Sequence, residues 1–311
     1  MPIFSVIIPL YNKEKFIEAT LKSVLAQTYI DFEIIIVNDG STDYSIQKVN
    51  QIKDSRIKIY HQENKGAASA RNQGIEKAVG ELIAFLDADD IWFDNHLEEL
   101  YKLYIDFPEC SLFASRYNIL LSKEKTYIPE YKKIKNTYRG VVFNYFVSSE
   151  YYPVATSSSI AIKKDIFDKI GYFKTYISSG QDTDMWIRIA LKYKIAIGNK
   201  ITATYLQYIP NTLSKTHISF KTIKKFEEYQ EFESQNVHLK KYLDKYRKEY
   251  ALHYKIAGDS KISTELYSQI DPKNISTKFK ILYFLPKLVL IYLLNLKRYL
   301  NRKGLEFTIY N

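Results

Sequence analysis

The 311-residue sequence predicts an α/β fold, with a mostly parallel central sheet flanked by helices and a helical region after it. Over the first hundred residues, apolar runs typical of buried strands alternate with segments of helical periodicity. Helices between successive strands favour parallel pairing. Three of the apolar runs end in short polar motifs. Ligands of such sheets bind beyond the carboxyl ends of the strands, so we expect these motifs to converge on one rim.

The first half of the chain divides into regular elements. We expect buried strands over residues Phe4–Leu10, 34–37, 57–60 and 82–86. We expect helices over Ile17–Leu25, where apolar residues recur at helical spacing, and over 66–79, which begins with small residues. This regular alternation is the main basis for the predicted fold class.

The second half carries weaker signals. Residues 116–150 are rich in Lys and Tyr without a clear period, which indicates an insertion or a loop-rich wall. Beyond them we expect a strand over 156–162 and helices over 164–170 and 181–193. Residues 218–257 are charged and are predicted to be helical, and we find no internal repeat.

Charge is distributed unevenly along the chain. The net charge is +10, and residues 240–311 hold 15 Lys and Arg against 6 Asp and Glu. The excess of positive charge therefore belongs to the C-terminal region. A nucleic-acid-binding protein more usually carries its positive charge on the folded surface that recognises the nucleic acid. We expect no nucleic-acid partner. The single Cys110 excludes an intramolecular disulfide and suits a reducing compartment.

An almost entirely apolar run occupies residues 281–296, interrupted by Pro286 and flanked by Lys and Arg. Its sixteen residues fall short of the ~20 that span a bilayer, and Pro286 would bend a helix. We expect a helix in the interface of an anionic membrane, with Tyr283 and Tyr292 at headgroup depth. Packing on the main core and a true membrane span are the alternatives. The chain starts directly with a strand-like run, so we expect no signal peptide.

Three carboxylates, Asp87, Asp89 and Asp90, follow the apolar run 82–86. Carboxylates at the end of a buried strand are costly to keep ionised unless a cation meets them. Hard divalent cations bind clustered carboxylate oxygens, so we expect Mn²⁺ or Mg²⁺ here. Asp90 has a second interpretation, as the cap of a helix that starts near Trp92.

Five segments carry a resemblance to a known family. They are SVIIPLYN, EIIIVNDGSTD, NKGAASARNQG, ELIAFLDADD and GQDTDMW. In their order and spacing they resemble the inverting family 2 glycosyltransferases of the GT-A fold, in the style of bacterial enzymes that build capsule, lipopolysaccharide or other surface glycans. The resemblance covers about residues 3–215 and is strongest over 3–95. It implies transfer of a sugar from a nucleotide-sugar, usually a UDP-sugar, to an acceptor hydroxyl.

The resemblance also implies a domain organisation. A GT-A domain would occupy residues 1–215, with a nucleotide-binding half over about 1–95 and an acceptor half over about 96–215. A helical C-terminal region, 216–311, would include a membrane-associating segment at about 275–303. These expectations place the chain in the cytoplasm, peripheral on the inner face of a bacterial plasma membrane, with a glycan or lipid-linked acceptor. The oligomeric state stays open.

The nucleotide-sugar site follows from the matching positions. Pro9 and Tyr11 would line the nucleoside pocket, and Asn12 and Asp39 would offer hydrogen bonds to the base. Arg71, near the start of a helix, would contact the base or the phosphates, which a helix N-terminus also favours. The alternatives are a simple turn at Asp39 and a solvated helix face at Arg71.

The resemblance implies different roles for the carboxylates. Asp87 would face the ribose or the water shell of the metal, and Asp89 would ligate Mn²⁺ or Mg²⁺ bridging the diphosphate of the donor. Asp182 would be the base that takes the proton of the acceptor hydroxyl. Asp182 could instead cap its helix, and Asp184 is the rival base. Trp186 would line the acceptor or sugar pocket, or simply pack the helix.

Two positions depart from the family pattern. Gln181 stands where the family usually has Glu, and Gln207 stands where Arg is common; Lys215 or His217 could compensate for the latter. These losses motivate an alternative, a catalytically degenerate membrane-bound scaffold. A sugar nucleotidyltransferase is less favoured, because the region after the first strand lacks a Gly-rich phosphate loop.

Overall fold

The computed structural model describes residues 1–122, 124–209, 218 and 221–302. The chain forms two compact units, residues 1–209 and 210–311. We treat each unit by itself. Lys215 and His217, the two candidates for replacing a cation at Gln207, lie outside the described residues.

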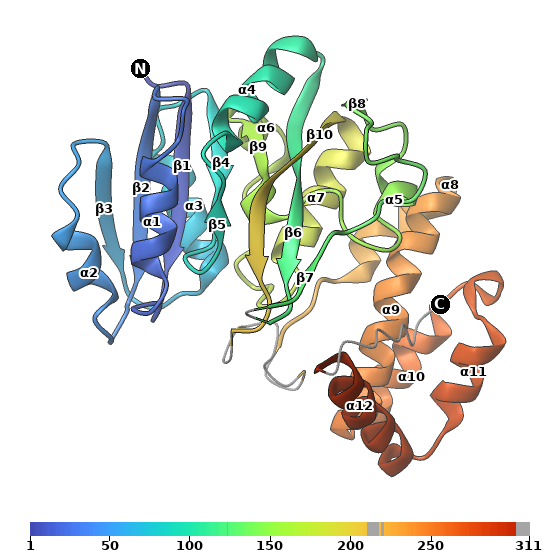
Figure 1. Ribbon diagram of the computed structural model, residues 1–311. Helices are drawn as coiled ribbons and strands as arrows, with labels where there is room; N and C mark the ends of the chain where they lie inside the picture. Colours follow the sequence, from blue (N-terminus) through green and yellow to red (C-terminus); the bar gives the residue numbers. More distant parts are fainter. Residues whose placement is uncertain (123, 210–217, 219–220, 303–311) are drawn as a thin grey trace. The chain divides into compact units, whose positions relative to one another are not determined.

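The first unit is a single sheet with helices on both of its faces (Figure 1). The strand order is β3-β2-β1-β4-β9-β6-β10-β5, with β7 on β6 and β8 on β10. The strands are β1 (Phe4–Leu10), β2 (Phe32–Asp39), β3 (Ile57–Gln62), β4 (Leu82–Phe85), β5 (Ile91–Trp92), β6 (Cys110–Leu120), β7 (Thr126–Tyr127), β8 (Gly140–Val141), β9 (Ile160–Lys163) and β10 (Lys194–Leu206). The helices are α1 (Ile17–Leu25), α2 (Ser45–Gln51), α3 (Ala67–Lys77), α4 (His96–Asp106), α5 (Tyr145–Ser148), α6 (Asp165–Ile170) and α7 (Gln181–Lys192), with a 3-10 turn, η1 (Ser157–Ser159).

The sheet is mixed rather than uniformly parallel. Strands β3, β2, β1 and β4 pair in parallel, and so do β6 and β10. Between the two blocks, β9 runs antiparallel to both β4 and β6. The predicted α/β fold with a central sheet, flanking helices and a helical C-terminal region is confirmed. The antiparallel join was not predicted, because pairing between distant segments leaves no local pattern.

Two predicted elements of the first unit differ in the structure. The strand expected over 156–162 begins only at Ile160, because residues 157–159 form the η1 turn. The long strand β6 extends into a segment expected to be loop-rich. Its apolar pattern is interrupted by Ser115 and Arg116, which are buried but hydrogen-bonded to the carbonyls of Ser159 (3.3 Å) and Lys135 (2.6 Å).

The second unit is helical. It contains η4 (Phe226–Tyr229), α8 (Gln230–Gln235), α9 (Val237–Ala257), α10 (Ser260–Ser268), η5 (Pro272–Asn274), α11 (Thr277–Phe284) and α12 (Lys287–Arg302). Its core includes Arg247, which is 2 % exposed and paired with Asp244 (2.9 Å) and Glu233 (2.8 Å). Asn236 caps α9, accepting hydrogen bonds from the amides of His238 and Leu239. The helical structure predicted for residues 218–257 is therefore divided among η4, α8 and α9.

The apolar run 281–296 is divided between two helices. Helix α11 ends at Phe284 and α12 starts at Lys287, so the predicted effect of Pro286 is confirmed. In the part of the chain that the structure describes, no helix is long and apolar enough to cross a membrane. Tyr283 is buried and stacks on Tyr267 with ring centroids 4.1 Å apart, so its predicted place at headgroup depth is wrong. Tyr292 is exposed.

Candidate active site

The strand register brings the polar motifs to one rim of the sheet. Leu10 at the end of β1 lies opposite Asn38 in β2, and Asp39 lies opposite Gln62 in β3. Beside β1, β4 ends at Phe85, opposite Ile7. The segments that follow β1, β2 and β4 therefore leave the sheet at its carboxyl edge, which is where ligands of such sheets bind. Tyr11 and Pro9 lie at this rim. Tyr11 is 46 % exposed, and Pro9 is partly exposed.

Asp39 organises the loop that precedes α3. Its carboxylate accepts hydrogen bonds from the backbone amides of Lys65 (2.8 Å) and Gly66 (2.9 Å) and from the Gln62 side chain (2.6 Å). The side chain is buried, so these bonds satisfy a carboxylate that would otherwise be costly to keep there. Asp39 thus fixes the position of the 63–66 loop. A ligand that donates a hydrogen bond to Asp39 would share carboxylate oxygens that already accept hydrogen bonds from the protein.

Asn12 connects the turn after β1 to the turn after β2 through hydrogen bonds. It has a φ of 51°, in the left-handed region that Asn tolerates better than most residues. Its side-chain oxygen accepts a hydrogen bond from the backbone amide of Thr42 (2.8 Å), and its own backbone amide donates to the Ser41 hydroxyl (3.2 Å). These two bonds hold the loops after β1 and β2 together at the rim.

Arg71 and Asp87 form a direct pair at the rim. A guanidinium nitrogen of Arg71 lies 2.6 Å from a carboxylate oxygen of Asp87. Arg71 is 4 % exposed, so the alternative of a solvated helix face is wrong. Its Nε and Nη1 are buried without a hydrogen-bond partner within the described structure. Asp87 is partly exposed, so the pair consists of a buried Arg71 guanidinium and a carboxylate that solvent can reach.

Asp89 is mostly buried, and its partner is Lys13. Burial raises the pKa of Asp89 above its ordinary value, and the Lys13 ammonium offsets part of that rise. Lys13 itself is anchored because its backbone amide donates to the Ser45 hydroxyl (2.7 Å). The role of Lys13 was not predicted, since nothing in the local pattern marks a lysine after a strand as the partner of a distant carboxylate.

Asp90 has a structural role, and its predicted function as a helix cap is wrong. Helix α4 starts at His96, after Asn95. The Asp90 carboxylate instead accepts hydrogen bonds from the Ser158 hydroxyl (2.5 Å) and the Leu206 amide (3.1 Å). Burial, together with the neighbouring carboxylates, raises its pKa well above the ordinary value. Asp90 thus joins the segment after β4 to η1 and β10.

Asp182 lies at the partly exposed start of α7. Gly180 occupies the position before the helix with a φ of 81°, a conformation that glycine adopts readily. Asp182 is the second residue of the helix, so the alternative of Asp182 as the helix cap is wrong. Its carboxylate is partly exposed and accepts a hydrogen bond from the adjacent Thr183 amide (2.7 Å). Asp182 as the base stays a prediction.

Asp184 is fully buried and engaged on both oxygens. Lys174 lies 2.9 Å from one oxygen, and Nε of Arg188 lies 2.9 Å from the other. Arg188 also donates to the carbonyls of Ile170 (2.8 Å) and Tyr172 (2.9 Å), so the trio holds the segment before α7 onto the helix. A carboxylate in this position cannot reach a substrate hydroxyl without breaking these pairs.

A connection that the sequence did not suggest joins α3 to the segment before α7. The side chain of Asn72 donates to the carbonyl of Phe173 (2.8 Å) and accepts from its amide (2.9 Å). The Phe173 ring also faces the Arg71 guanidinium at 5.7 Å and packs edge-on against Trp186 at 6.0 Å. Trp186 is 1 % exposed, so of its two interpretations the structure supports packing.

The two positions that depart from the family pattern lie at the ends of elements. Gln181 is the first residue of α7, beside Asp182, and is partly exposed. Gln207 follows β10 and is exposed, and its backbone amide donates to the carbonyl of Leu120 (3.1 Å).

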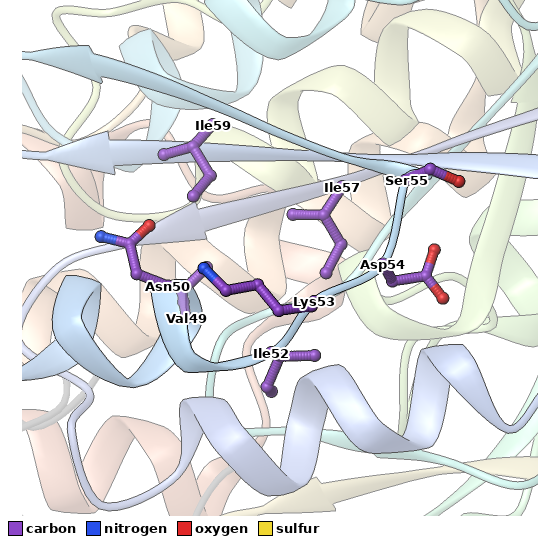
Figure 2. Close-up of a pocket in the computed structure, with 8 residues that line it drawn as sticks. All are labelled: Val49, Asn50, Ile52, Lys53, Asp54, Ser55, Ile57 and Ile59. Atoms are coloured by element: carbon purple, nitrogen blue, oxygen red, sulfur yellow. The ribbon is translucent and has the colours of Figure 1, made fainter.

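A hollow of about 470 Å³ lies elsewhere on the first unit (Figure 2). It is lined by the end of α2, the start of β3 and the loop between them, with Ile57 and Ile59 on one side and Lys53 and Asp54 nearby. This loop enters β3 at its amino end, away from the carboxyl rim. The hollow is therefore separate from the candidate site.

The carboxylates at the rim were predicted to hold a divalent metal. Among residues 1–122, 124–209, 218 and 221–302, no cluster of three or more His, Cys, Asp or Glu side chains could hold a metal ion. Mg²⁺ is usually bound by one or two carboxylates together with substrate phosphates, and Asp89 can supply one carboxylate. In this structure the Asp89 carboxylate is paired with Lys13, so Asp89 as a metal ligand stays a prediction.

The fold places the protein in a structural class. The crystal structure of S. aureus TarS 1-349 in complex with UDP-GlcNAc aligns with a TM-score of 0.59 and 18 % identity, over 85 % of this chain and 90 % of that chain. At this identity the likeness shows the fold alone, and it confirms the predicted GT-A fold. A sequence profile described as "Glycosyl transferase family 2" matches residues 5–171. The match covers more than half of the chain, which therefore belongs to glycosyl transferase family 2.

Curated relatives agree with this assignment. An uncharacterized glycosyltransferase of Rickettsia felis is 35 % identical over 200 residues, which cover 61 % of this chain and 31 % of that protein. The UDP-Glc:alpha-D-GlcNAc-diphosphoundecaprenol beta-1,3-glucosyltransferase WfgD of Escherichia coli is 50 % identical over 95 residues, or 30 % of this chain and 38 % of that protein. The chain thus spans about a third of the length of these relatives.

Proposed function

We propose that the chain is an inverting glycosyltransferase that moves a sugar from a UDP-sugar to a hydroxyl group of a glycan or lipid-linked acceptor. The observation that carries the proposal is the contrast between the two carboxylates of α7. Asp182 is partly exposed at the start of the helix, whereas Asp184 is fully buried between Lys174 and Arg188. A general base must reach the proton that it takes, and Asp182 is the one of the two that can.

The donor would bind at the carboxyl rim of the sheet. The ring of Tyr11 is 46 % exposed and can stack on a nucleobase, with Pro9 beside it. Asp39 and Asn12 hold the loops that border this position and can share hydrogen bonds with the base. Arg71 adds a buried positive charge suited to phosphate oxygens.

In the proposed reaction, the Asp182 carboxylate takes the proton of the acceptor hydroxyl. The acceptor oxygen forms a bond to the anomeric carbon while the bond from that carbon to the phosphate oxygen breaks. The electron pair leaves with UDP, and the configuration at the anomeric carbon inverts. The acceptor oxygen is itself the nucleophile, so the reaction needs no nucleophile from the protein. The only group that the chain must supply for the attack is the base, Asp182.

Asp89 would hold a divalent cation at this site, and Asp87 would face the water shell of the cation or the ribose. When bound, Mn²⁺ or Mg²⁺ would neutralise the charge that develops on the departing diphosphate. Arg71 would contribute to the same end through Nε and Nη1, which have no hydrogen-bond partner within the described structure, whereas Lys13 would compete with the cation for Asp89.

The nature of the donor and the acceptor rests on the relatives. TarS has been crystallised with UDP-GlcNAc, and the name of WfgD gives a UDP-glucose donor, a diphosphoundecaprenol-linked acceptor and a beta-1,3 product. These names favour a UDP-sugar and a lipid-linked acceptor for this chain, in the synthesis of a bacterial surface glycan. A lipid-linked acceptor in turn favours a peripheral location on the inner face of the plasma membrane.

The experiment is a panel of UDP-sugars with a lipid-linked acceptor and Mn²⁺, in which UDP release and the glycan product are both measured. We expect one donor to give UDP and a product whose new linkage, determined by NMR, is inverted relative to the donor. Retention of configuration would contradict the single displacement. No transfer from any UDP-sugar, with donor binding intact, would favour a degenerate scaffold.

A further inference from the structure

Helices α11 and α12 expose a run of large apolar side chains at helical spacing. Its members are separated by three or four residues each and are between 38 % and 78 % exposed: Ile281, Phe284, Leu288, Tyr292, Leu296 and Tyr299. The four members in α12 recur at intervals of about one helical turn, so they share one face of that helix. We call these six residues the apolar stripe.

The other side of these helices is already occupied. Phe279 is fully buried, Tyr283 stacks on Tyr267, and Leu290 is 3 % exposed. Helix α12 packs against α9, and Lys255 donates to the carbonyl of Tyr283. The helices are therefore held in the second unit by one face, and the apolar stripe is the face that this packing leaves to solvent.

The segment of sequence that carries the stripe has charged residues of a single sign. Residues 272–305 contain eight Lys and Arg and no Asp or Glu. Lys280 and Lys287 are exposed next to members of the stripe. Apolar side chains flanked by basic ones, in a helix too short to span a bilayer, are the pattern of helices that lie in the interface of an anionic membrane.

We propose that the apolar stripe binds the surface of an anionic lipid bilayer, with α12 lying in the plane of the interface. A second copy of the chain fits less well, because it would bring two segments of high positive charge together. An anionic bilayer matches both features, because its headgroups match the positive charge and its acyl-chain boundary matches the exposed apolar area. The binding is a property of the second unit and does not depend on the proposed reaction.

The experiment is co-sedimentation of the full chain with phosphatidylcholine vesicles that contain or lack phosphatidylglycerol. We expect binding to the anionic vesicles, weakened by salt, and roughly tenfold weaker binding after the double change Leu288→Glu and Tyr292→Glu. The charge-neutralising pair Lys280→Gln and Lys287→Gln should weaken binding to anionic vesicles alone. Val237→Glu is the matched control, because Val237 is 71 % exposed in the same unit but lies in α9.

A second measurement does not depend on those variants. Trp92 and Trp186 are 3 % and 1 % exposed, so a tryptophan introduced as Leu288→Trp adds a distinct exposed fluorophore. Its emission should shift to the blue on adding anionic vesicles, and brominated lipids should quench it. Unchanged emission overturns the proposal. Vesicle binding by the Leu288→Glu, Tyr292→Glu variant that equals binding by the unchanged chain also overturns it. The proposal is likewise overturned if the unchanged chain does not bind vesicles but forms a dimer that this variant abolishes.

Discussion

Replacing Asp184 tests how α7 divides its two carboxylates between structure and chemistry. Asp184→Asn keeps the shape of the side chain but removes the charge that meets Lys174 and Arg188, each 2.9 Å away. Removing one partner of a buried pair costs about 3–5 kcal/mol. The Lys174 and Arg188 side chains are 23 % and 15 % exposed, so water offsets part of this loss. We therefore expect a smaller destabilisation, of about 2–3 kcal/mol.

The assay is thermal unfolding of the full chain, followed by the fluorescence of the buried Trp92 and Trp186, of which Trp186 lies in the same helix as Asp184. For a unit of this size, about 2–4 °C in melting temperature corresponds to 1 kcal/mol, so we expect a fall of roughly 4–12 °C. The matched control is Asp165→Asn, since Asp165 is an exposed carboxylate paired with Lys169 in a surface ion pair. An unchanged melting temperature for Asp184→Asn, combined with lost sugar transfer, would refute the reasoning and make Asp184 the base.

Single contacts elsewhere in the first unit give three more expected outcomes. Lys13→Met removes the ammonium that pairs with Asp89, so we expect Mn²⁺ affinity in the presence of UDP to rise about fivefold in calorimetry; a fall would contradict the competition. Burial lowers the pKa of His96 from 6.5 to about 3, so the unfolded chain binds a proton that the native chain does not, and stability should fall by roughly 1.4 kcal/mol per pH unit as the pH drops below about 6.5. Urea unfolding of His96→Leu should lack this part of the slope, and an identical slope would refute it. Asn72→Ala removes both bonds to Phe173, so we expect about 2 kcal/mol lower stability and slower transfer; unchanged values of both would show that the connection is dispensable.

The local part of the fold was predictable because it rests on local patterns. The apolar runs of β1, β2 and β4 are buried almost throughout, and the spacing of Ile17, Leu21 and Val24 places them on the buried face of α1. The break at Pro286 follows from the missing amide of proline. Such features depend on residues close together in the chain.

The unpredicted features depend on residues that are far apart in the chain. Lys13 meets Asp89, and Asp90 meets Ser158 and Leu206, across separations that leave no periodic trace. The antiparallel strand β9 is likewise defined by its neighbours β4 and β6 rather than by its own four residues. The sequence motifs correctly predicted that the ends of β1, β2 and β4 lie at one rim. The hydrogen bonds within that rim could be identified only from the structure.

The same distinction applies to Gln207, one of the departures from the family pattern. The sequence marks the position because an Arg is common there. The structure adds that its backbone amide is held by the carbonyl of Leu120 at 3.1 Å and that the residue is exposed.

The most direct test of the proposed function is the Asp182→Asn variant, studied with the donor identified in the UDP-sugar panel. Two quantities are measured on the same protein: sugar transfer to the acceptor and donor affinity by calorimetry. We expect transfer to fall by about a hundredfold or more, because the amide cannot take a proton, while donor affinity and melting temperature stay unchanged. Near-normal transfer by Asp182→Asn would contradict the assignment of Asp182 as the base.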